Sequence, residues 1–67
     1  MDRKLANKAM RLASRGTEAE IDAFEDEQGD ALSAVLDGLW FDAEEAGDTA
    51  LAARLGRAFN KLTDREE

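Results

Sequence analysis

Apolar residues recur at intervals of three and four along most of the chain, which is the spacing of one face of an α-helix. The clearest example is the stretch 30–46, whose apolar positions are Leu32, Val35, Leu36, Leu39, Trp40 and Ala43. No stretch alternates between apolar and polar residues with a period of two, and Pro is absent. We therefore predict an all-α fold with no β-strand.

Glycines mark the expected ends of the helices. Gly16, Gly29 and Gly47 each follow a helical pattern, and each precedes a residue that favours a helix N-terminus. These junctions predict a small bundle of four short helices, near 2–15, 17–28, 30–46 and 48–64. The helices would form a single acidic domain, 1–67, with its last few residues frayed.

The residues after these glycines predict how the helices begin. Thr17 and Glu20 have the spacing of a capping box, in which each side chain accepts a hydrogen bond from the backbone N–H of the other residue. Asp30 is expected to cap the third helix, and Asp48 or Thr49 the fourth.

The inner faces of the four helices define the expected core. It contains Leu5, Leu12, Ile21, Phe24, Leu32, Leu36, Leu39, Trp40, Leu51, Leu55, Phe59 and Leu62. Trp40 falls on the inner stripe of the third helix, whereas Phe41 falls on the opposite side among small and acidic residues. Phe41 is therefore expected either to contact a partner or to be covered by another helix of the bundle.

Composition limits the size of this core. The 67 residues include 13 Ala but only 16 large apolar side chains, and the net charge at pH 7 is −7. Such a chain lies near the boundary of the disordered class, so it needs very regular helix packing, a bound group or a partner chain. The absence of Cys excludes disulfides and thiolate metal sites, and the absence of His removes the commonest general base.

Charge is segregated along the chain. Residues 1–16 carry a net charge of +4, residues 48–67 are balanced, and residues 17–47 hold eleven acids and no base. Those acids are Glu18, Glu20, Asp22, Glu25, Asp26, Glu27, Asp30, Asp37, Asp42, Glu44 and Glu45. Like charges four residues apart, such as Asp22 and Asp26, destabilise an isolated helix. Two compensations are open, because the basic face of the first helix or a basic partner protein could lie against the acids.

The acids match no catalytic or metal motif. A calcium loop with Gly47 at its sixth position would begin at Asp42 and end at Ala53, where a bidentate carboxylate is required. Ser14 and Ser33 have no His to serve as a base. We therefore expect no enzyme, no metal site and no cofactor. No apolar run reaches the roughly 20 residues of a membrane span, and no signal peptide is recognisable, so we expect a cytoplasmic protein.

The charge pattern favours a small acidic regulator or inhibitor that binds a protein with a basic surface. Cationic sites on proteins often hold nucleic acid, and an acidic helical face could compete for them, as phage-type DNA-mimic inhibitors of host defence do. The expected contact residues are Glu18, Asp22, Glu25, Asp26, Asp37, Phe41 and Glu44. A pI near 4.4 argues against direct binding of nucleic acid or of a membrane.

Two alternatives stay open. The first is a structural module, in which a second copy completes the thin core of a helical homo-oligomer such as a homodimer. The second is a helix-turn-helix-like DNA-binding protein that uses the basic first and fourth helices, with Arg54, Arg57, Lys61 and Arg65 at spacings of three and four. Its second helix, however, holds six acids and no base, and phosphate would repel it.

Overall fold

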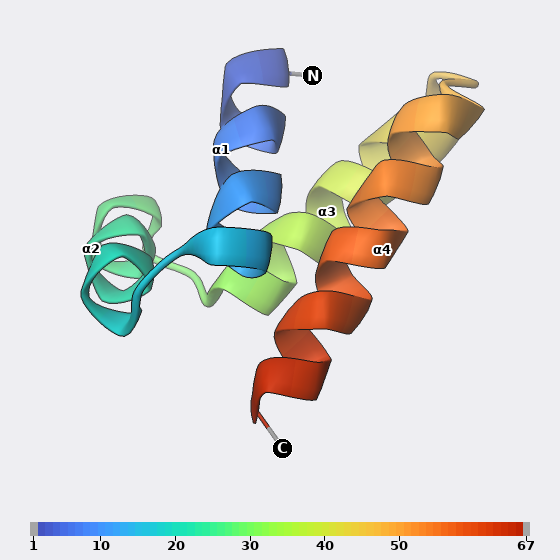
Figure 1. Ribbon diagram of the computed structural model, residues 1–67. Coiled ribbons are helices and arrows are strands. Elements are labelled where there is room, and N and C mark those ends of the chain that lie inside the picture. Colours follow the sequence, from blue (N-terminus) through green and yellow to red (C-terminus); the bar gives the residue numbers. More distant parts are fainter. Residues whose placement is uncertain (1, 67) are drawn as a thin grey trace.

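The fold is all-α. A computed structural model describes residues 2–66, apart from the side chain of Glu66, and shows four helices (Figure 1). They are α1 (Arg3–Arg15), α2 (Glu18–Gln28), α3 (Leu32–Glu45) and α4 (Thr49–Glu66). No residue in the described range forms a strand. The predicted helical bundle is confirmed, and every predicted boundary lies within two residues of the observed one.

The helices are arranged around the pair α3 and α4. These two run antiparallel and side by side, joined by a short turn, and α1 packs across one face of the pair (Figure 1). α2 lies to one side and is seen nearly along its axis in Figure 1. The Cα atoms span 33 × 24 × 15 Å. The short dimension corresponds to two layers of helices, because packed helices lie about 8–10 Å apart.

The core is built from leucines and alanines. Its buried apolar residues are Ala6, Ala9, Met10, Leu12, Ala13, Phe24, Leu32, Leu36, Leu39, Ala43, Leu51, Ala52, Leu55, Ala58 and Leu62. Small side chains on α1 let this helix approach the α3–α4 pair closely, which is how a chain with few large apolar residues still excludes water. No charged or polar side chain is buried within the described part of the chain.

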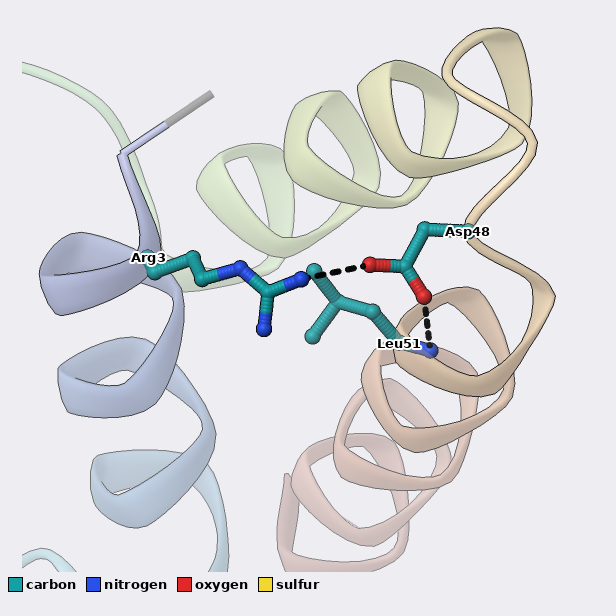
Figure 2. Close-up of polar contacts among 3 residues, drawn as sticks. All are labelled: Arg3, Asp48 and Leu51. Carbon is teal, nitrogen blue, oxygen red and sulfur yellow. Dashed lines mark hydrogen bonds and ion pairs between the residues drawn. The ribbon is translucent and has the colours of Figure 1, made fainter.

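Two of the predicted N-terminal caps are confirmed. The Thr17 hydroxyl accepts from the backbone N–H of Glu20 at 3.2 Å, and the Glu20 carboxylate accepts from the N–H of Thr17 at 3.0 Å. At the start of α4, one carboxylate oxygen of Asp48 accepts from the N–H of Leu51 at 3.1 Å (Figure 2). Both caps satisfy N–H groups that the helix itself leaves without partners.

The predicted cap of α3 is wrong. Ala31, not Asp30, occupies the N-cap position and supplies no side-chain hydrogen bond. Instead, the carboxylate of Glu25 in the last turn of α2 accepts from the N–H of Leu32 at 2.6 Å. Gly29 makes this possible, since its left-handed conformation, φ 79°, ends α2 and reverses the chain toward α3.

The end of α4 is tied to the end of α1. The Arg65 guanidinium donates to the carbonyls of Leu12 and Ala13, both at 3.2 Å, and to that of Gly16 at 2.6 Å. α4 itself extends to Glu66. Gly16 is required here, because a Cβ at this position would lie 2.7 Å from the carbonyl oxygen of Leu12.

Two aromatic residues of the predicted core are exposed. Trp40 and Phe59 keep 39% and 36% of their surface in contact with solvent, and Leu5 and Ile21 are only partly buried. The reason is that α1 covers one face of the α3–α4 pair, while Trp40 and Phe59 lie at the other. Phe41 is 57% exposed and no helix of this chain covers it, so the outward orientation predicted for it is correct.

Candidate protein-interaction surface

The exposed aromatics border a groove between α3 and α4, which we call the aromatic groove. It has a volume of about 260 Å³ and is lined by Leu36, Asp37, Trp40, Leu55, Gly56, Phe59 and Asn60. Leu36 and Leu55 are fully buried, so they form its floor, and Trp40 and Phe59 stand at its sides. All of the lining residues belong to α3, within 36–40, or to α4, within 55–60.

A second stripe on α3 supplies the acidic border of the groove. Asp37, Trp40, Phe41 and Glu44 follow one another at i, i+3, i+4 and i+7, so they share one side of the helix. The buried leucines of α3 are spaced in the same way, but they lie on a different side of the helix. Three of the seven predicted contact residues, Asp37, Phe41 and Glu44, are thus brought together, with Trp40 among them.

The other predicted contact residues lie on α2. Glu18, Asp22 and Glu25 line a wide hollow between α2 and the last turns of α4. Asp26 is exposed on the same helix. Glu25 is partly buried and caps α3, so its first role is structural. The predicted surface is therefore divided into an α2 part and an α3 part.

Of the residues that line the aromatic groove, sequence reasoning placed only Asp37 among the contact residues. Trp40 and Phe59 were assigned to the core, and Gly56 was assigned to no site. The spacing of Asp37, Trp40, Phe41 and Glu44 is the signal that could have identified Trp40, because it forms a complete second helical stripe of acids and aromatics.

The acids of 17–47 are not neutralised within the molecule. Among residues 2–65 the only ion pair joins Arg3 to Asp48 at 3.0 Å, and Figure 2 shows it reaching from α1 to the start of α4. Of the two compensations left open, direct ion pairs between the bases of the first helix and these acids do not form within residues 2–65. Two hydrogen bonds from Thr17 hold the pKa of Glu20 below its ordinary value, and attraction to Arg11 is a smaller cause. The first helix instead packs mainly on α4, away from most of the acids.

Three basic residues of α4 lie on a different surface. Arg54, Arg57 and Lys61 of α4 line a groove of about 240 Å³ with Met10 and Ser14 of α1. Arg65, the fourth member of the basic line predicted on the last helix, is occupied by the carbonyls at the end of α1. Three bases of α4 thus lie where α1 meets α4, whereas Lys8 and Arg11 of α1 lie toward α2.

No metal site is formed by the part of the chain that the structure describes, since it contains no group of three or more His, Cys, Asp or Glu placed to hold an ion. None of its helices is long and apolar enough to cross a membrane. No protein-family model matches the chain, and no curated protein or solved structure is significantly similar to it.

Proposed function

We propose that the protein is a binding module of the regulator or inhibitor class that engages a partner protein with a basic surface. One observation supports this most strongly: the eleven acids of 17–47 make no ion pair within the described chain, and the α3 acids lie beside exposed aromatics. Uncompensated like charges destabilise a fold, and such a cost persists mainly where function requires it. We propose no catalytic role.

The two acidic parts would contribute differently to binding. The α2 acids Asp22 and Asp26 are exposed and would attract a basic partner over a distance, which raises the association rate. On α3, Asp37 and Glu44 flank Trp40 and Phe41, so charge and apolar area lie on one side of one helix. Aromatic residues in that position are common anchors of protein interfaces. A basic site that otherwise holds nucleic acid would suit this surface.

A homo-oligomer is the second candidate, because the exposed Trp40 and Phe59 are what a second copy would cover. Each copy carries a net charge of −7, however, so two copies repel each other. Binding of a basic partner protein would not involve this repulsion.

The test is a comparison of single charge reversals. The immobilised protein is exposed to a lysate of its native host, and a retained basic protein is identified by mass spectrometry and purified. Asp37→Lys should slow its association about tenfold at low salt. Asp64→Lys, which makes the same charge change on α4, is the matched control and should have a much smaller effect. Equal association rates for the wild type and Asp37→Lys would refute the proposal.

A further inference from the structure

We infer that the aromatic groove receives an amphipathic helix of the partner, with apolar side chains entering the groove and Lys or Arg side chains facing the acids of α3. This inference rests on the proposed function and names the chemistry of the partner. Two antiparallel helices with a groove between them accept a third helix through anchors one turn apart, which is a recurring mode of peptide recognition.

The groove has the apolar character that this mode requires. Its floor is the buried Leu36 and Leu55, and its sides are the indole of Trp40 and the ring of Phe59. In a closed four-helix bundle a fourth helix would cover this face of the α3–α4 pair. Here α1 occupies the opposite face and α2 lies to one side, so the chain leaves this position open to a helix from another molecule.

The charges around the aromatic groove indicate which kind of helix would bind in it. Asp37 is the only charged residue that lines the groove, and Glu44 lies one turn beyond Trp40 on the same side of α3. Arg54 and Arg57 are on the other flank of α4, where they border α1. A second copy of this chain would bring its own Asp37 and a net charge of −7 to the same place. A basic helix meets the acids with opposite charge, and we therefore favour it over a second copy.

Two glycines provide a matched pair of probes. A Cβ at Gly56 would meet no atom within 4 Å, so the fold accommodates a side chain there, and that side chain would occupy the groove. Gly38 is equally open but does not line the groove. Leucine at either position replaces a helix-interior glycine with a stronger helix former, so both variants should be folded.

The experiment uses three synthetic peptides and the fluorescence of Trp40, the only Trp of the chain. The first peptide is an amphipathic helix with a leucine stripe flanked by lysines, the second has the same composition in scrambled order, and the third carries Glu in place of Lys. The first peptide should shift the Trp40 emission to shorter wavelength and bind at least about tenfold more tightly than the other two. Gly56→Leu should weaken this binding about tenfold, whereas Gly38→Leu should leave it within about twofold.

Three results would overturn the inference. One is unchanged peptide binding by Gly56→Leu. Another is equal binding of the lysine peptide and the glutamate peptide. The third is sedimentation of the free protein as a dimer in which Trp40 is shielded from a soluble quencher, because the second copy would then be the occupant.

The same variants separate this inference from the proposed function. If binding of the native partner depends on Asp37 but tolerates Gly56→Leu, the groove inference fails and the proposed function stands. If the lysine peptide occupies the groove but Asp37→Lys has no effect on the native partner, the proposed function fails and the peptide result does not rescue it.

Discussion

α2 and the α3–α4 pair are held in the fold by very different means. α2 buries one side chain fully, Phe24, and packs Ile21 partly against the core. The ammonium of Lys8 lies 5.7 Å from the centre of the Phe24 ring, which adds a cation–π contact. The α3–α4 pair instead buries a double row of leucines: Leu32, Leu36, Leu39, Leu51, Leu55 and Leu62.

The part of the fold that buries most of the core is not the part that is most densely acidic. The helix with the fewest buried residues carries six acids and no base, and the helices with most of the core carry the aromatic groove. A helix attached so weakly opens at a lower free energy than the rest of the domain. We therefore expect α2 to exchange its amide hydrogens faster than α3 and α4.

The largest effect should come from the α3–α4 core. Leu55 is fully buried, and Leu55→Ala should lower the free energy of unfolding by about 4 kcal/mol, through lost burial and the cavity left behind. In a domain of this size that loss is comparable to the whole stability. Urea denaturation followed by circular dichroism measures it. A loss below about 1 kcal/mol would mean that the pair is not the stable part of the fold.

A smaller and more local effect is expected at α2. Phe24→Ala removes the one fully buried side chain of that helix. It should lower the free energy that holds α2 on the core by about 3 kcal/mol. Because α2 is able to detach, the loss should appear as fast amide exchange over Glu18–Gln28, with α3 and α4 still protected. Cooperative loss of protection in all four helices would show that α2 is integral to the core.

The capping box of α2 should give a pH dependence. Hydrogen bonds from Thr17 lower the pKa of Glu20 below its ordinary value of 4.5, so the ionised form stabilises the folded helix. This contribution is fully present above pH 4.5 and disappears as the pH falls through the lowered folded-state value. The stability difference between the wild type and Glu20→Gln should follow that course in pH-dependent denaturation. Glu27→Gln, which changes the same charge outside the cap, is the control.

The smallest effect concerns repulsion within α2. Asp22→Lys replaces the like charges of residues 18, 22 and 26, which are four residues apart, with alternating ones and should raise the stability of α2 by a few tenths of a kcal/mol. Moderate salt should stabilise the wild type by screening the same repulsion, and less so the variant. Thermal melts at low and moderate salt measure both effects. A wild-type melting temperature that falls steadily with salt would show that attraction dominates instead.

The helices and most caps could be predicted because their signals are local. The glycines at 16, 29 and 47 mark junctions, and Thr17 with Glu20 forms its capping box within one turn. The cap of α3 could not be predicted in this way, since it comes from Glu25 in the preceding helix. Which helix end a side chain reaches depends on how the connecting turn directs the chain, and that is a property of the folded structure.

The exposure of the aromatics depends on packing between helices. Trp40 and Phe59 fit the inner stripes of their helices, and in a closed bundle a third helix would have covered them. Their exposure follows from the position of α2. The spacing of apolar residues along the chain does not reveal where that helix packs. Helical spacing also does not show that bases of α1 come close to α2, as Lys8 does over the Phe24 ring, without forming an ion pair with its acids.

The bond between Arg65 and the end of α1 has a consequence for the nascent chain. Arg65 lies 53 residues after Leu12, so during synthesis the carbonyls at the end of α1 lack this donor until α4 has been made, and only that of Leu12 already accepts from the Gly16 N–H. Closing a loop of this length must precede the contact, which places it late in folding. α1 is made before α2, α3 and α4 but is therefore among the last of the four to acquire its final end.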